Sequence, residues 1–270
     1  MNPELGGQAV SLGWLDLAIA STLLLASAAL ALALQLGITR SFLIAAARMT
    51  IQLLLIGQIL TWLFAQASLW LTLACGAVML LVAGYEVTSR QERQLTSGWS
   101  FLLGTGTMTL SSTLVLFLAL TTQIGADPWY DPRYAIPLFG MILGNAMTGI
   151  ALGLNSLTAR LESDARGIEA QLLLGATRWQ ALRPSLRHAL RSGFMPIVNS
   201  MAATGLVALP GMMTGQILAG AAPTQAVKYQ LLVMFLIASA TSLGVVAAVL
   251  ASAWRVTDHR DRLRLDRLRS

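Results

Sequence analysis

Long uninterrupted apolar runs constrain this chain more than any other feature of its sequence. Only 11% of its 270 residues are charged and 56% are hydrophobic, whereas soluble domains average about 25% charged residues. Most of the runs reach the ~20 residues that a helix needs to cross ~30 Å of hydrocarbon. Backbone polar groups inside a bilayer must be satisfied within the protein, so helices are expected. The sequence predicts an all-α membrane protein with about seven transmembrane helices, at residues 14–36, 43–64, 69–85, 101–121, 135–157, 194–220 and 231–254.

Arginine and lysine determine the predicted orientation. If the N-terminus lies outside, 15 of the 18 basic residues fall in inside segments. Arg133 and Lys228 then lie outside, and Arg48 lies within the second span. Cytoplasmic loops carry an excess of basic residues, so we expect the N-terminus outside and the C-terminus in the cytoplasm. The first basic residue is Arg40, so the positively charged start of a cleavable signal peptide is missing and the first span should be retained.

Charge and motif content exclude several classes of function. The net charge is +6, but the arginines flank apolar spans, which indicates cytoplasmic loops and anionic lipid rather than nucleic acid. The lone cysteine, Cys75, cannot form an intrachain disulfide. The only lysine, Lys228, follows Val227, so the G-x-x-x-x-G-K-[ST] loop that cradles phosphates cannot occur in these residues. We therefore expect no enzyme activity here, and a separate subunit if ATP drives the protein.

The chain divides into a predicted transmembrane domain, residues 1–256, and a charged tail, residues 257–270. Because the tail mixes both charge signs, we expect a solvated cytoplasmic helix or a disordered end. The outside loop at residues 122–137 is rich in proline, aspartate and aromatic residues. Its aromatic residues suit an interfacial belt, and a substrate gate is the alternative.

The cytoplasmic segment at residues 158–193 combines apolar and basic periodicity. One apolar side is predicted for its first helix, from Ile168 and Leu172 to Leu173 and Trp179. Pro184 is well placed to begin a second helix, which carries arginines at every fourth position, Arg183, Arg187 and Arg191. Either the segment lies on anionic lipid or it docks to a cytoplasmic partner. A mid-helix Gly175, which costs about 1 kcal/mol, favours docking.

Part of this segment, "EAQLLLGATRWQALRP", resembles the E-A-A…G loop of ABC transporter permeases, which seats a coupling helix in the ATPase subunit. Other stretches, "ARMTIQLLLIGQIL", "GYEVTSRQER", "IPLFGMILGNAM", "NSMAATGLVALPGMMTGQILAG" and "AVKYQLLVMFLIASAT", resemble the FetB-type permease family, over residues 45–256. That family comprises bacterial iron export permeases and plant relatives linked to aluminium tolerance.

The resemblance implies the permease subunit of an ATP-driven exporter of iron or a related metal, in the bacterial inner membrane. It implies two copies of this chain, with no tightly bound cofactor and with ATP and magnesium on a partner ATPase. The residues that match the coupling loop are Glu169, Ala170, Gly175, Ala176 and Arg178.

Polar residues within spans are costly and mark candidate substrate pathways. Pro210 and Gly211 should break the sixth span at membrane depth, and broken backbone there is tolerated only beside protein or a water-lined cavity. The candidate pathway residues are Gln52, Glu86, Met141, Asn145, Asn199, Met212, Met213 and Gln216.

The metal ligands stay unassigned. Methionine thioethers prefer Cu(I), and iron(II) is served better by carboxylate, imidazole or amide groups. Both histidines, His188 and His259, are predicted to be cytoplasmic. Two other functions therefore stay open, an ABC permease for an organic substrate such as a nucleotide sugar, and a secondary transporter or channel without an ATPase. An intramembrane protease is disfavoured because no histidine lies in a span to activate a serine.

Overall fold

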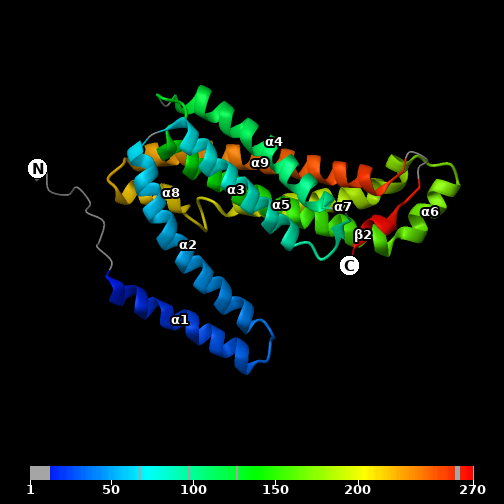
Figure 1. The fold of residues 1–270 in the computed structure, drawn as a ribbon, viewed down its shortest axis with the longest axis horizontal. Coiled ribbons are helices and arrows are strands. Elements are labelled where there is room, and N and C mark those ends of the chain that lie inside the picture. The colour runs from blue at the N-terminus through cyan, green and yellow to red at the C-terminus, as the bar shows by residue number, and fades with distance from the viewer. Residues whose placement is uncertain (1–12, 67, 97, 126, 259–261, 270) are drawn as a thin grey trace, which may run out of the picture. The chain divides into compact units, whose positions relative to one another are not determined.

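The computed structural model of this chain is built almost entirely of helices (Figure 1). It describes residues 13–66, 68–96, 98–125, 127–258 and 262–269. The described helices are α1 (Trp14–Ala33), α2 (Thr39–Gln66), α3 (Leu69–Ser89), α4 (Trp99–Leu118), the π-helical turn η1 (Ala119–Ile124), α5 (Pro132–Ser163), α6 (Ala165–Leu173), α7 (Arg178–Ala203), α8 (Gly211–Leu218), α9 (Pro223–Val256) and the 3₁₀ turn η2 (Leu265–Arg267). Two short strands, β1 (Gln94–Leu95) and β2 (Leu268–Arg269), pair antiparallel. The prediction of an all-α multi-pass membrane protein is confirmed.

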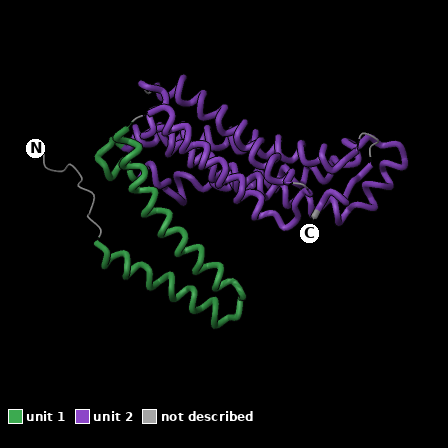
Figure 2. Tube along the Cα trace, in the orientation of Figure 1, with its two compact units in different colours: residues 1–66, 215–222 green, residues 67–214, 223–270 purple. Residues whose placement is uncertain are grey.

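The chain separates into two compact units, coloured differently in Figure 2. Unit 1 comprises residues 1–66 and 215–222, and unit 2 comprises residues 67–214 and 223–270. Within unit 1, α1 packs against α2. Their connection turns at Gln35 and Gly37, which both have positive φ, 52° and 70°. Glycine takes this backbone conformation without strain, so Gly37 suits the turn.

Unit 2 is a bundle in which α5 lies at the centre, in contact with α3, α4, α7 and α9. α5 and α7 cross closely: a Cβ on Gly193 would lie 2.9 Å from the carbonyl oxygen of Gly149, and a Cβ on Gly149 would lie 2.9 Å from that of Gly193. One turn further along α5, Gly153 faces Ala189. The two helices are therefore antiparallel, and small residues allow the close approach.

α9 runs parallel to α5. Gly149 faces Thr241 and Val245, and Gly153 faces Val245 and Val249. Since α5 and α9 point the same way, the chain between them has to return along the bundle, and α7 makes most of that return.

The core of unit 2 consists of two hydrophobic clusters. The main cluster joins α3, α4, α5, α7 and α9 and includes Met108, Leu157 and Val249, all fully buried. A second cluster lies nearer the N-terminal ends of α5 and α9 and includes the fully buried Ile142 and Ala240. Both are lined by long aliphatic side chains, so they hold the bundle together without buried charge.

Six described helices are long and apolar enough to cross a membrane, α1, α2, α3, α4 extended by η1, α5 and α9. The predicted span at residues 194–220 does not form one helix. Its first part belongs to α7, which ends at Ala203, and its last part contains α8, which begins at Gly211. The helix is thus interrupted over residues 204–210, as Pro210 predicted. The helix before the interruption, α7, begins at Arg178 and therefore far earlier than the predicted start at residue 194. The count of seven passes and the outward N-terminus stay predictions.

The C-terminal tail folds back onto unit 2. β2 pairs with β1, and a bridge between Thr257 and Leu263 precedes it. Leu263, Leu265 and Leu268 pack against the main cluster. Hydrogen bonds from Arg264 hold the pKa of the exposed Asp266 carboxyl below its usual value. The prediction of a solvated helix or disordered end is wrong for the described part of the tail, because alternate leucines anchor it to the core.

Candidate functional site

The predicted coupling segment folds as α6, a tight turn and α7. Gly175 is not in mid-helix: its φ is +92°, and it follows the last residues of α6. Its N–H donates to the carbonyl of Leu172 at 3.0 Å, and that of Ala176 donates to Gln171 at 3.0 Å. These two bonds define a Schellman motif, for which glycine is the favoured residue. The glycine therefore ends α6, and the mid-helix explanation for it was wrong.

α7 begins at a reciprocal capping box. Thr177 Oγ1 accepts from the N–H of Gln180 at 3.4 Å, and the Gln180 side chain accepts from the N–H of Thr177 at 3.0 Å. Pro184 lies inside α7 rather than at its start. A proline in a helix interior removes one hydrogen bond, but buried Leu182 and Leu186 on either side pack into the core. That packing stabilises α7 across the proline, so the second helix does not begin there.

The predicted apolar side of α6 is partly buried in the core and partly exposed. Ile168 is 2% exposed and packs in the main cluster, and Leu172 packs beside it. Leu173 and Leu174 are each 88% exposed. Glu169 lies on α6 one turn before Leu173 and is exposed as well. The exposed apolar side chains here are Leu173 and Leu174, whereas Ile168 and Leu172 pack against the core.

The remaining predicted coupling residues lie in different surroundings. Ala170 is exposed on α6, whereas Ala176 is partly buried in the turn. Arg178 lies 5.6 Å from the centroid of the Trp179 ring. It also lines a depression of about 360 Å³ with Arg255 from the end of α9 and Asp258 from the start of the tail. Sequence reasoning missed this neighbourhood, since it depends on the tail folding back.

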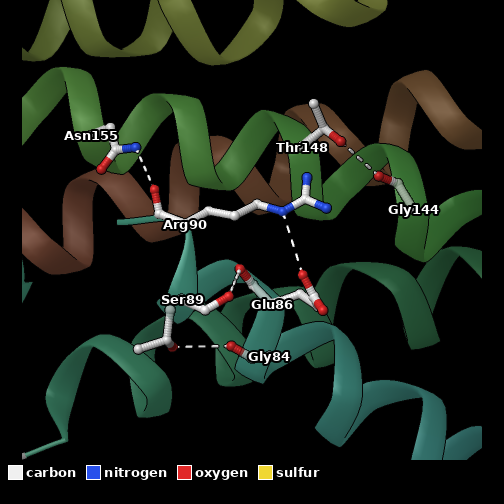
Figure 3. A network of polar contacts seen from close by, with 8 residues as sticks. Gly84, Glu86, Ser89, Arg90, Gly144, Thr148 and Asn155 are labelled. Atoms are coloured by element: carbon white, nitrogen blue, oxygen red, sulfur yellow. Dashed lines mark hydrogen bonds and ion pairs between the residues drawn. The ribbon is translucent and has the colours of Figure 1, made fainter. Parts of the chain in front are cut away.

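At the end of α3, Glu86 pairs with Arg90 at 3.6 Å (Figure 3). The Arg90 side chain extends alongside α5, and its carbonyl accepts from the Asn155 amide at 2.9 Å. Asn155 Oδ1 also accepts from the N–H of Glu92 at 3.1 Å. Asn155 thus fixes the α3–α4 connection onto α5. Sequence reasoning missed it because its partners are backbone groups more than 60 residues away.

Two predicted pathway residues from distant parts of the chain border the same cluster. Met141 of α5 and Met212 of α8 both pack against the second hydrophobic cluster. Asn145 lies one turn after Met141 and donates its amide to the Met141 carbonyl at 2.9 Å. Methionine fills irregular gaps in apolar cores, and the contact with the cluster fits that role for both thioethers.

The other pathway residues are dispersed. Asn199 is exposed on α7, and Gln52 is exposed on α2 of unit 1. Met213 and Gln216 follow Met212 on α8 and are partly buried. The side-chain oxygen of Gln216 is buried and has no hydrogen-bond partner among the described residues. Such an oxygen is costly to leave unsatisfied, so it is available to a polar or cationic ligand.

Within the described residues, histidine, cysteine, aspartate and glutamate side chains form no group of three or more that could hold a metal ion. His188 is exposed on α7, and His259 lies outside the described residues. The amide, thioether and carboxylate residues predicted for the pathway therefore stay predictions.

A family model, "Uncharacterised protein family (UPF0014)", matches residues 14–256. The chain is 38% identical over 248 residues to "UPF0014 membrane protein slr1647" of Synechocystis, covering 91% of this chain and 94% of that protein. It is 32% identical over 214 residues to the Escherichia coli "Probable iron export permease protein FetB", covering 79% of this chain and 80% of that protein. It is also 32% identical over 217 residues to the Arabidopsis "Protein ALUMINUM SENSITIVE 3", covering 78% of this chain and 72% of that protein. No solved structure matches the chain.

Proposed function

We propose that this chain, which belongs to the UPF0014 family of membrane proteins, is the membrane-spanning permease subunit of an ATP-driven exporter in the bacterial inner membrane. The name of the Escherichia coli relative supports a permease that moves iron or a related metal. ATP and magnesium would bind a separate ATPase, since Lys228 is the only lysine and cannot complete a phosphate-binding loop. Two copies of the chain would form the pathway.

The exposed end of α6 is the observation that carries the proposal. Leu173 and Leu174 are 88% exposed, beside the exposed Glu169. They lie next to a turn that is fixed by the Schellman motif at Gly175 and the capping box at Thr177. Large apolar side chains on a rigid turn are suited to fill a pocket on a partner.

Co-purification with the ATPase tests the proposal. We expect the wild-type chain to recover an ATPase subunit and to drive ATP-dependent metal efflux when both are reconstituted in vesicles. Full burial of a leucine is worth about 1.5–3 kcal/mol. Leu173→Ser combined with Leu174→Ser should therefore weaken the association at least thirtyfold, by the usual conversion of roughly 2 kcal/mol or more.

A matched control is available at the other end of α7. Leu206 and Val207 are also strongly exposed, 95% and 86%, and lie in the interrupted stretch. Leu206→Ser combined with Val207→Ser removes the same kind of surface and should leave ATPase recovery unchanged. Metal flux without any ATPase would instead establish a secondary transporter or channel. ATP-dependent flux of an organic solute but no metal would refute the metal assignment.

A further inference from the structure

An open groove of about 900 Å³ on unit 2 is lined by four exposed arginines. Three of them, Arg183, Arg187 and Arg191, come from successive turns of α7, and Arg160 comes from the end of α5. Residues four apart lie on one face of a helix, so the α7 guanidinium groups share one wall. The other lining residues are Pro184, Leu186, His188, Leu190 and Leu250.

This positive charge has no counter-charge within the described part of the chain. No aspartate or glutamate lines the groove. Among the described residues, none of the four guanidinium groups forms an ion pair. Glu162 is close to Arg160 in sequence, but it pairs with Arg93. A concave surface lined by one sign of charge concentrates ions of the opposite sign. The groove is therefore suited to an anion from outside the chain.

The chemistry of the charges favours phosphate. Guanidinium groups present a planar fork of donors that matches phosphate oxygens bidentately. Their side chains are long enough to converge on one anion from different turns. Arginine outperforms lysine at such sites because its fork is preorganised.

The groove also has an apolar side. Leu190 of α7 and Leu250 of α9 line it, and Leu250 is 39% exposed. Trp254, one turn after Leu250, is 57% exposed, and exposed tryptophan is typical of the membrane–water interface. Arg160 lies three residues before the end of α5. The groove thus combines basic groups along α7 and at the end of α5 with an apolar wall formed by α7 and α9.

We propose that this groove binds the phosphate headgroup of an anionic phospholipid, with the acyl chains along Leu190 and Leu250. Basic pockets between transmembrane helices bind such headgroups in other membrane proteins. A soluble phosphate would use the arginines but not the apolar wall. An acidic surface on a protein partner is the alternative occupant, and ATPase recovery distinguishes it in the test below. The inference does not rest on the proposed docking surface, because no residue of α6 or of the Thr177 turn lines the groove.

Lipid retention by the purified full chain tests the proposal. The chain is mixed in detergent with phosphatidylglycerol or phosphatidylcholine, and bound lipid is measured by native mass spectrometry. Each basic residue near an anionic lipid contributes roughly fivefold in affinity, so Arg183→Gln with Arg187→Gln should weaken phosphatidylglycerol binding roughly thirtyfold. The control variant, Arg133→Gln with Arg262→Gln, removes two positive charges from exposed positions outside the groove. It should retain the lipid. Both double variants are checked for monodispersity by gel filtration.

A second variant keeps all four arginines. Leu250→Glu introduces an acid into the apolar wall and should also expel phosphatidylglycerol. The proposal is wrong if the arginine variant retains phosphatidylglycerol as the wild type does, or if phosphatidylcholine binds equally well. It is also wrong if millimolar inorganic phosphate displaces the lipid completely, which identifies a free-anion site. Loss of ATPase recovery with unchanged lipid retention in the same variant would assign the groove to the protein partner instead.

Discussion

The crossing of α5 and α7 predicts a sharp difference between two glycine-to-alanine substitutions. A Cβ on Gly193 would lie 2.6 Å from Val245 Cγ1, 2.9 Å from the carbonyl oxygen of Gly149 and 3.3 Å from the Gly153 Cα. The valine methyl can move, but the two backbone atoms belong to α5 and cannot move without displacing the helix. On α5 itself, a Cβ on Gly144 would meet no atom within 4 Å. The two positions therefore share a helical backbone but differ in available space.

Overpacking a close contact costs about 1–3 kcal/mol, while alanine gains about 1 kcal/mol over glycine in a helix. Gly144→Ala should keep that gain, whereas Gly193→Ala should lose it to the clash with α5. We expect Gly193→Ala to be less stable than Gly144→Ala by about 2 kcal/mol, which is roughly 5 °C in melting temperature for a chain of this size. Thermal unfolding of both purified variants in the same detergent measures this difference.

Equal melting temperatures for the two variants would refute the reasoning. That result would mean that α5 and α7 do not touch through backbone at this point, and the antiparallel pairing of the two helices would lose its main support. A lower melting temperature for Gly144→Ala would show that its open side is occupied in the assembled protein. A second copy of the chain or a lipid would then be the occupant to identify.

Three further predictions concern topology and the candidate site. Reporter fusions after Arg191 should read cytoplasmic and those after Asp131 external, and an external signal at Arg191 would overturn the orientation. Met213→Leu and Gln216→Leu should each lower transport while expression and ATPase recovery stay intact. If both variants transport at the wild-type rate, these residues only pack and do not belong to the pathway. Gly175→Trp should abolish ATPase recovery and ATPase stimulation, whereas Gly175→Asn should retain more of both because asparagine tolerates positive φ. Full coupling in the tryptophan variant would contradict the docking role.

Membrane-spanning helices were the most predictable part of the fold. Apolar runs of about 20 residues in a lipid environment have few alternatives to helix, so α1, α3, α4, α5 and α9 overlap their predicted spans closely. Their ends were less predictable. α9 begins at Pro223, well before the predicted start at residue 231, because a helix can continue beyond the hydrocarbon where hydropathy gives no signal.

The boundary between α6 and α7 was misjudged although its local signals are in the sequence. "Gly-Ala-Thr-Arg-Trp-Gln" combines a glycine that ends one helix with a threonine and a glutamine three residues apart, which form a capping box. Pro184 is a competing signal, because proline also favours the first turn of a helix. The proline is tolerated because the packed leucines on either side of it stabilise α7, and such tertiary compensation cannot be read from local sequence.

The tail and the Asn155 contacts were unpredictable for a different reason. Leu263, Leu265 and Leu268 alternate with charged residues, a pattern that suits a solvated segment as well as an edge strand. Only the presence of β1 between α3 and α4 gives β2 a partner, and that pairing joins positions about 170 residues apart. The same long range prevents any sequence-based grouping of the pathway residues, which come from both units.

The continuity of α7 bears directly on how the proposed docking surface and the proposed pathway are linked. α7 runs for 26 residues, or about 39 Å at the usual rise, from the capped turn beside the exposed α6 leucines to the interrupted stretch before α8. Neither Pro184 nor Pro196 ends the helix, so α7 is one continuous helix from one end to the other. The close approach at Gly193 lies 15 residues from Arg178 and 10 from Ala203, about 22 Å and 15 Å along the axis. A tilt of α7 about this contact would displace its two ends in opposite directions, so a partner that moves the Thr177 turn also moves the backbone that leads into Met212 and Met213.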